Sequence, residues 1–211
     1  MAMFRFPKGV VVGARSSRCA YGEATLSVST QDDTLGNCPE GDGSVVLGRL
    51  NTATGKWATV LGGNGNTSSG SLSSVLGGKR NAAHGEYSTV SAGSENYASG
   101  LFSSVSGGSK NTASNTGSSV SGGSSCNAVG VLSSVLGGSK NTANGGNSAI
   151  VGGLSSVSKG RYSSIVGGIQ NTATGQSASV SGGYRNTAVA KASVVAGGRQ
   201  TKNTRPYTIL P

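Results

Sequence analysis

This chain of 211 residues has little charge, few aromatic side chains and no long apolar run. Charged residues make up 11% of it and aromatic residues 5%. No stretch approaches the roughly 20 consecutive apolar residues that a membrane-spanning helix needs. The start, Met1 to Pro7, also lacks the apolar run of a signal peptide. We therefore expect no membrane span and no export by the ordinary secretory route.

Cysteine is scarce as well. The three cysteines, Cys19, Cys38 and Cys126, make an odd count at irregular spacing. Small disulfide-stapled domains carry an even count, and zinc sites usually carry C-x-x-C pairs, which are missing here. The sequence therefore predicts neither a disulfide framework nor a structural zinc site.

Groups suited to catalysis are few. The chain has a single histidine, His84, and outside residues 27–44 only three carboxylates, Glu23, Glu86 and Glu95. Catalysis needs a base together with a nucleophile or a metal in one pocket. The many serines follow a repeat and have no evident histidine or aspartate partner. We predict a protein that is not an enzyme and has no catalytic residue, metal site or cofactor.

What the chain does contain is glycine, 37 residues of it, arranged in a fifteen-residue repeat from Val45 to Thr201. The unit is V-x-G-G-x-x-N-x-A-x-G-x-x-S-S. Its fourth position is always Gly, its seventh is usually Asn and its ninth is usually Ala. A fixed period over most of a chain is typical of a repeat architecture. The first position falls at Val45, Val60, Val75, Val90, Val105, Val120, Val135, Ile150, Ile165, Val180 and Val195.

Each unit predicts one coil of a β-solenoid. Positions fourteen, one and three alternate as in a strand, and so do positions seven, nine and eleven. The glycines mark the corners between these strands. Coils would stack about 4.8 Å apart, so eleven of them would make a rod about 50 Å long. We expect the recurring asparagines to form a hydrogen-bonded ladder along the axis.

The run from Ala98 to Asn111, A-x-G-x-x-S-x-V-x-G-x-x-x-N, resembles the head repeat of YadA-like trimeric autotransporter adhesins. The resemblance covers about three quarters of the chain. It implies an all-β fold, a left-handed parallel β-roll with three chains packed around a common axis. This chain departs from that family by carrying Val at position one, and the family's stalk and membrane anchor have no counterpart in these residues.

The repeat divides the chain into three parts. We predict an N-terminal cap and irregular loop in residues 1–44, a repeat domain in residues 45–201 and a C-terminal tail in residues 202–211. Residues 27–44 break the period and hold four of the seven acidic residues. They lack the order of a calcium-binding loop, so we expect a solvated loop, with cation binding as the alternative. The tail either caps the last coil or reaches into a neighbour.

A single roll of this kind buries little apolar area. One Val and one Ala per coil contribute a few kcal/mol at about 25 cal/mol per Å², against roughly 1–2 kcal/mol for each ordered residue. Apolar residues also recur at positions two and thirteen, outside the coil, and predict a stripe that binds another chain, with a homotrimer implied by the resemblance. This predicted interface comprises Val46, Trp57, Leu61, Leu72, Leu76, Tyr87, Phe102, Leu132, Leu136, Val151, Tyr162 and Val166.

The chain has a net charge of +10, and some of its basic residues recur at fixed positions of the repeat. Basic residues at positions five and six would form one line that attracts nucleic acid, an anionic glycan or an acidic protein surface. No aromatic residues interleave with it as in single-strand binders. The alternative is that these charges keep a Gly- and Ser-rich rod in solution. The predicted basic edge comprises Arg49, Lys79, Arg80, Lys110, Lys140, Arg185 and Arg199.

These features predict a structural or adhesive trimer that serves as a building block of a larger external assembly, such as a virion fibre, spike or minor capsid protein. Its partners would be further copies of itself and other assembly proteins. One alternative is a cell-surface adhesin head that binds host matrix or glycans. Another is an ice-binding solenoid, because Thr recurs at position eight, although Tyr97, His84, Lys159 and Asn127 interrupt the array.

Overall fold

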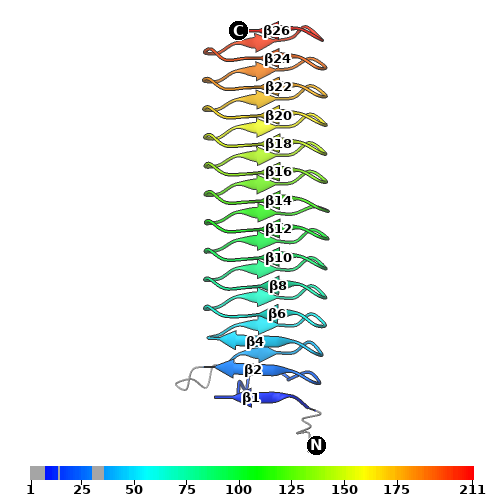
Figure 1. Cartoon of the computed structure of the whole chain (residues 1–211), viewed down its shortest axis with the longest axis vertical. Coiled ribbons are helices and arrows are strands. Elements are labelled where there is room, and N and C mark those ends of the chain that lie inside the picture. The colour runs from blue at the N-terminus through cyan, green and yellow to red at the C-terminus, as the bar shows by residue number, and fades with distance from the viewer. Residues whose placement is uncertain (1–7, 14, 30–35) are drawn as a thin grey trace, which may run out of the picture. The chain divides into compact units, whose positions relative to one another are not determined.

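The computed structural model of this chain describes residues 8–13, 15–29 and 36–211. These residues form β-strands and turns without a helix, and every strand pairing among them is parallel. No helix with the length and apolar character needed to cross a membrane is found in this part of the chain. The chain forms two compact units, Met1–Phe102 and Ser103–Pro211, and each is a β-solenoid of stacked coils of about fifteen residues (Figure 1).

The described residues of the first unit form eleven strands, most of them two residues long. They are β1 (Val10–Val12), β2 (Leu26–Ser29), β3 (Cys38–Pro39), β4 (Val45–Gly48), β5 (Thr52–Ala53), β6 (Thr59–Val60), β7 (Thr67–Ser68), β8 (Ser74–Val75), β9 (Ala82–Ala83), β10 (Thr89–Val90) and β11 (Tyr97–Ala98).

The second unit contains the remaining strands. They are β12 (Ser104–Val105), β13 (Thr112–Ala113), β14 (Ser119–Val120), β15 (Asn127–Ala128), β16 (Ser134–Val135), β17 (Thr142–Ala143), β18 (Ala149–Ile150), β19 (Val157–Ser158), β20 (Ser164–Ile165), β21 (Thr172–Ala173), β22 (Ser179–Val180), β23 (Thr187–Ala188), β24 (Val194–Val195), β25 (Lys202–Asn203) and β26 (Ile209–Leu210).

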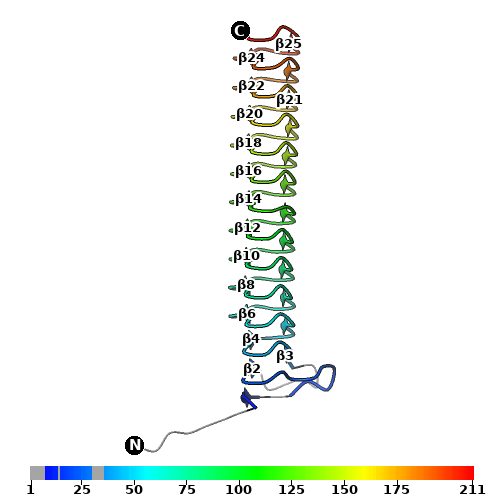
Figure 2. The same ribbon diagram turned by 90° about the vertical axis from the view of Figure 1, so that its right-hand side faces the viewer.

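Within each unit the coils build two parallel sheets. The even-numbered strands form one sheet and the odd-numbered strands from β3 onward form the other, with β1 paired to β2 at the N-terminal edge. Seen edge-on, the two sheets lie on opposite sides of the coils (Figure 2). The register of β6 and β8 places Val60 beside Val75, one repeat apart. The predicted all-β parallel solenoid of fifteen-residue coils is therefore confirmed.

The core is a narrow channel between the two sheets. On the even-numbered side, positions fourteen and one point inward, and the intervening position fifteen points outward. On the odd-numbered side, position nine points inward. In the repeats that begin at Val60 to Val180, the core therefore holds one Val or Ile, one Ala or Ser at position nine and one further Ser or Ala at position fourteen, all fully or nearly fully buried. This narrow section explains why the repeat uses small residues.

Both corners of each coil require positive φ. Position four, always Gly, has φ of +82° to +96° in the coils described, for example +88° at Gly78 and +86° at Gly138. Positions six and thirteen adopt left-handed conformations near +55° although most of them are not Gly, as at Arg80 and Trp57. L-residues visit this region rarely because of steric crowding at Cβ. The coil geometry imposes these angles on whatever side chain stands there.

The asparagine ladder is confirmed, but its bonds run through the backbone. The Asn66 side chain donates from Nδ2 to the carbonyl oxygens of Gly62 (2.9 Å) and Gly78 (3.0 Å). Its Oδ1 accepts a hydrogen bond from the backbone N–H of Asn81 at 2.9 Å. Each buried Asn thus ties the glycine corner of its own coil to the next coil. The ladder begins earlier than the repeat predicted, because the Oδ1 of Asn37 accepts from the N–H of Asn51.

The structure of the N-terminal coils differs from the prediction in two ways. The segment expected as a loop contains part of β2 and all of β3, and these strands pair with β4 and β5. The first complete coil is one residue shorter than its successors, so Val46, not Val45, occupies the core column beside Val60. Val46 is fully buried. The prediction that Val46 belongs to the outward interface was therefore wrong. It assumed a fifteen-residue coil here, whereas this coil has one residue fewer.

Cys19 and Cys38 form a disulfide, with their Cα atoms 5.8 Å apart. The prediction of no disulfide was therefore wrong. The two cysteines are 19 residues apart, which is also the offset between Leu26 and Val45 in the paired strands β2 and β4. They thus occupy equivalent positions on neighbouring coils, separated by an enlarged coil. A spacing that looks irregular in sequence is regular in the stack.

The C-terminal tail continues the solenoid. Strand β25 pairs with β23, and β26 pairs with β24, both at the fifteen-residue offset. Asn203 occupies the inward position of Ala188 in the coil before it. Its Nδ2 donates to the carbonyl oxygens of Val194 and Thr208. The last ten residues therefore add one more coil to the second unit.

Candidate functional site

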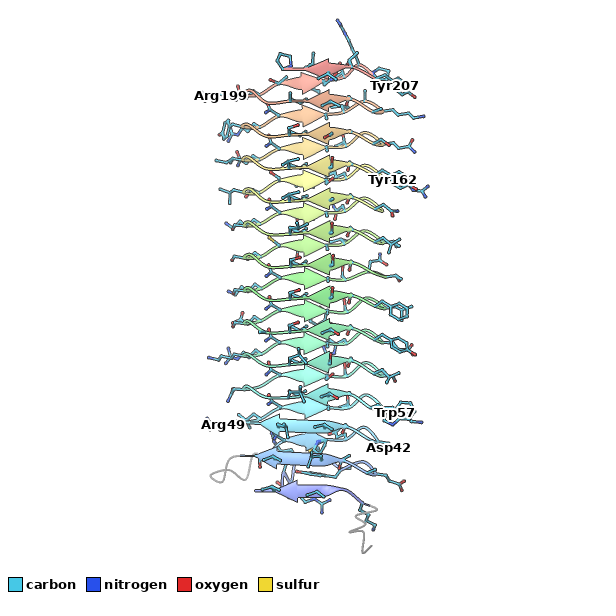
Figure 3. All side chains as sticks on the ribbon, viewed as in Figure 1. Asp42, Arg49, Trp57, Tyr162, Arg199 and Tyr207 are labelled. Atoms are coloured by element: carbon cyan, nitrogen blue, oxygen red, sulfur yellow. A yellow bond between two sulfur atoms is a disulfide. The ribbon has the colours of Figure 1, made fainter. Side chains whose placement is uncertain are left out.

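The seven residues of the predicted basic edge all lie at the corner that follows the glycine pair. Arg49 and Lys79 stand in one column of bridged residues, with Asn64 between them. Arg80 stands next to that column, at position six. In the first unit, Arg49 projects from the edge opposite Trp57 (Figure 3). The second unit carries Lys110, Lys140, Arg185 and Arg199 at the equivalent corner, and all seven side chains are exposed.

Charge is divided unevenly between the two units. All seven acidic residues of the chain precede residue 103, together with eight of the 17 Lys and Arg residues. Residues 103–211 contain the other nine basic residues and no Asp or Glu. Net charges of +1 and +9 follow, which sum to the +10 of the whole chain. Every Lys, Arg, Asp or Glu side chain of the second unit is therefore a cation.

An aromatic residue interrupts the basic edge of the second unit. Tyr184 lies at position five, bridged to Ile169 in one neighbouring coil and to Arg199 in the other. The guanidinium carbons of Arg185 and Arg199 lie 4.9 and 5.5 Å from the centre of its ring. Arg185 also donates from Nε to Oε1 of Gln170 at 2.7 Å. The expectation that no aromatic residue interleaves with the basic edge was wrong at this place.

The opposite corner also combines cations with aromatic rings, which sequence reasoning missed. Lys56 Nζ lies 4.4 Å from the centre of the Trp57 ring, and the Arg161 guanidinium carbon lies 4.8 Å from that of Tyr162. In the second unit, Tyr162 and Tyr207 project from the edge opposite Arg199 (Figure 3). The signal was available, because a basic residue at position twelve directly precedes the ring at position thirteen.

The outward apolar residues form two columns and not one stripe. Position thirteen lies in the turn before each even-numbered strand, whereas position two follows that strand. Four residues of extended chain span about 13 Å, so Leu72 and Leu76 face different surroundings. Within the position-thirteen column, Tyr87 and Phe102 stack with ring centres 4.9 Å apart. Apart from Val46, the predicted interface residues are 42–58% exposed.

Position two belongs to a larger surface, the uncharged face, which is the outer face of the even-numbered sheets. It consists of the residues that flank each buried Val or Ile on that side of the coil. Among the described residues of both units, this face carries no charged side chain. Its apolar members are Val10, Val12, Leu26, Val28, Val45, Leu47, Leu61 and Leu76 in the first unit and Leu136, Ala149, Val151, Val166, Val194, Ala196 and Ile209 in the second.

His84 has a serine partner that the sequence did not reveal. The Ser69 hydroxyl and the His84 Nδ1 form a hydrogen bond between neighbouring coils. The imidazole also meets the ring of Tyr97 edge-on, with centres 4.8 Å apart. Burial lowers the pKa of His84 below its ordinary value of 6.5. All three residues stand on the outer face of the odd-numbered sheet, which holds a column of Thr residues broken at this place.

The lowered pKa of His84 predicts an acid-sensitive stability. The unfolded chain binds a proton near pH 6.5 and the folded chain only at lower pH. The free energy of unfolding should therefore fall as the pH drops through about 6.5 and level off below the folded pKa. Urea unfolding at pH 7.5 and 5.5 measures this, with His84→Ser as the control because Ser99 fills the same position one coil later. An equal pH dependence in both proteins would contradict the prediction.

The cysteines also bear on metal binding. Cys19, Cys38 and Glu40 place their ligand atoms within 4.8 Å of one another, the one such group in the described part of the chain. Both sulfur atoms are joined in the disulfide, so they are not thiolates that could bind a metal. Of the four acidic residues behind the alternative of a cation in the loop, Asp32 and Asp33 lie outside the described residues, whereas Glu40 and Asp42 are described.

No protein-family model matches this sequence, and the search of curated proteins finds no match for it either. The fold of each unit agrees with the resemblance to the YadA-like head repeat at the level of a parallel solenoid with coils of about fifteen residues.

Proposed function

We propose that this chain is a structural and adhesive protein without enzymatic activity, which assembles as a homotrimer into a larger external structure such as a virion fibre, a spike or a minor capsid layer. The observation that supports it most is the uncharged face. A protein surface exposed to water normally carries charge, whereas the centre of a protein interface is depleted of it. A charge-free face with apolar residues on each unit suits contact with another chain.

The thin core gives a second reason for assembly. Each coil buries one branched aliphatic side chain and a few small ones, while Leu61, Leu76 and Val166 remain about half exposed. Burying these side chains against a partner would add apolar area at about 25 cal/mol per Å². Every copy of the chain presents the same face, so a closed symmetric assembly buries that face on all copies at once. The resemblance to a trimeric head favours threefold symmetry.

The disulfide between Cys19 and Cys38 supports an external location. Disulfides persist on virions, on cell surfaces and in secreted proteins, and they are rare in reducing compartments. In the proposed trimer the uncharged faces meet near the axis, and the two corners with their cations and aromatic rings lie at the rim. That arrangement leaves the charged corners free for adhesion and avoids burying Lys or Arg without a counter-charge.

Light scattering on the purified chain tests the assembly. We expect a mass of three times 20.6 kDa that persists at high salt, since apolar contacts are not screened. Leu61→Lys with Leu76→Lys should dissociate the trimer. Thr54→Lys with Ser99→Lys adds the same charge to the outer face of the odd-numbered sheet and should leave the mass unchanged. A wild-type monomer at all concentrations, or equal behaviour of the two variants, would refute the proposed interface.

A separate observation supports the alternative function as an adhesin. Cations lie over aromatic rings at both corners of the second unit, at Tyr162 and at Tyr184. Such exposed clusters are common in recognition surfaces, where Tyr and Arg are enriched. An adhesive role and an assembly role are compatible, because a fibre or spike carries both.

A further inference from the structure

The cluster around Tyr184 gathers two cations where the sequence supplies no anion. Two guanidinium groups, from Arg185 and Arg199, share the half-buried Tyr184 ring at 4.9 and 5.5 Å. Exposed cation–π contacts stabilise a protein only weakly, and like charges placed together oppose that gain. No Asp or Glu exists in residues 103–211 to offset the repulsion. An oxyanion placed at the two guanidinium groups would supply what this cluster lacks.

Hydrogen bonds hold Arg185 and Tyr184 in positions that suit anion binding. Arg185 donates from Nε to the Gln170 side chain at 2.7 Å, which fixes the guanidinium and leaves its terminal N–H groups for a ligand. Tyr184 is held by its backbone, because its N–H donates to Gly198 and its carbonyl accepts from Gln200. A guanidinium fork matches the two oxygens of a carboxylate or sulfate and binds them with charge-assisted hydrogen bonds.

We propose that Tyr184, Arg185 and Arg199 form a binding site for the sulfate or carboxylate groups of an acidic polysaccharide. The proposal rests on the adhesive part of the proposed function and extends it to a ligand class. The polysaccharide would run along the basic edge of the second unit, with the Tyr184 cluster as its best-defined contact and the lysines of the same edge as further contacts.

Charge density favours a polysaccharide over a nucleic acid. Lys110, Lys140, Arg185 and Arg199 are spread over six coil steps, about 29 Å, or about one cation per 10 Å. A nucleic acid strand carries one negative charge per about 3.4 Å, so most of its phosphates would face no cation here. The guanidinium groups of Arg185 and Arg199 also lie against the Tyr184 ring, where they would compete with a stacking base.

The neutral residues of the same edge suit sugar hydroxyl groups. Positions five and six between the cations carry Ser139, Ser155 and Gln170, which are polar and uncharged, and also the exposed apolar side chains Leu154 and Ile169. Hydroxyl and amide groups both donate and accept hydrogen bonds, as sugar hydroxyls do. A polymer with spaced charges and many hydroxyl groups therefore complements the polar part of this edge.

Isothermal titration of the full chain tests the site with three probes at about 0.15 M salt, where long-range attraction is screened. The probes are a keratan sulfate oligosaccharide, which carries sulfate and no carboxylate, a hyaluronan oligosaccharide, which carries one carboxylate per disaccharide, and a single-stranded DNA of similar length. We expect binding of at least one glycan and weaker binding of the DNA. Binding of keratan sulfate alone would identify sulfate as the recognised group, binding of hyaluronan alone would identify carboxylate, and binding of both would identify the shared oxyanion; each supports the site.

Charge-neutral variants separate the cluster from general attraction. Arg185→Lys and Arg199→Lys keep the net charge but remove the guanidinium fork, and each should weaken glycan binding about tenfold. Lys already stands at the same two positions in other coils, at Lys140 and Lys79, so folding should be retained. Arg205→Lys, in the turn before β26, is the matched control and should change glycan binding less than twofold.

Several results would overturn the site. They are unchanged glycan binding by both Arg185→Lys and Arg199→Lys, tighter binding of DNA than of either glycan, or no glycan binding by the wild-type chain. Light scattering on the same samples keeps this inference separate from the assembly proposal. A trimer that binds no glycan refutes the polysaccharide site alone, and a monomer that binds glycan through these residues refutes the trimer alone.

Discussion

Gly138→Ala should lower the free energy of unfolding by about 4 kcal/mol or more, whereas Gly137→Ala, one residue earlier, should leave it nearly unchanged. A Cβ at Gly138 would lie 2.2 Å from the carbonyl oxygen of Gly153 and 2.5 Å from Nδ2 of Asn141. The residue also has φ of +86°, which an L side chain tolerates poorly. Both the coil stacking and the asparagine ladder would have to give way.

The neighbouring position is the matched control. A Cβ at Gly137 meets no atom within 4 Å, and the corresponding residue of an earlier coil is Ala92. Replacing a Gly by Ala at a compatible site stabilises a protein slightly, by about 0.4–1 kcal/mol, because the unfolded chain loses freedom. Denaturant unfolding followed by circular dichroism measures both variants. Equal stabilities would mean that the fourth-position glycine is not required by the stack.

The sequence was sufficient for the repeating part of this fold. A strict period, an inward Val or Ile, and glycines at corners together specify coils, their spacing and the inside of the channel. The reason for the fourth-position glycine could not be seen there, because the atom that crowds Gly138 most closely, the carbonyl oxygen of Gly153, belongs to the next coil. Contacts of this kind exist only after coils are stacked.

The rule that residues fifteen apart are neighbours would have found more of the site. It places His84 beside Ser69, Phe102 beside Tyr87, and Arg185 beside Gln170. Sequence reasoning compared copies of the repeat to find what they share. The functional contacts lie in the positions where neighbouring copies differ.

The fifteen-residue rule does not apply to the N-terminal coils, because these coils differ in length. A coil of 19 residues follows the segment with Cys19, and the next is one residue shorter than the repeat. Without the strand register, neither the partner of Cys38 nor the burial of Val46 could be derived. Insertions and deletions change which residues meet while leaving the pattern on either side intact.

Asn66→Asp should destabilise the chain by about 2–6 kcal/mol at pH 7, although the side chain keeps its size. The substitution removes two N–H donors and leaves the carbonyl oxygens of Gly62 and Gly78 facing another oxygen, in a fully buried place. Each buried polar group left without a partner costs about 1–3 kcal/mol. The ladder bond to the N–H of Asn81 would remain, since a carboxylate accepts hydrogen bonds.

The same variant should recover stability in acid. Burial disfavours the carboxylate and raises its pKa above the unfolded value of about 3.9. The folded state then binds a proton more readily than the unfolded state, so the deficit against wild type shrinks as the pH falls from 7 toward 4. Protonation also restores one O–H donor for a glycine carbonyl. Urea unfolding at several pH values measures the difference.

One coil of this chain has Ser in place of the ladder Asn, and it provides the control. Ser156 accepts from the N–H of Asn171 at 3.2 Å, which is the acceptor half of the Asn role. Asn66→Ser should therefore cost less than Asn66→Asp at pH 7 and show no recovery in acid. In the opposite direction, Ser156→Asn should stabilise the chain by about 1 kcal/mol through the restored donors. If Asn66→Asp is as stable as wild type at pH 7, the amide donors do not hold the glycine corners, and the recurrence of Asn must come from its acceptor alone.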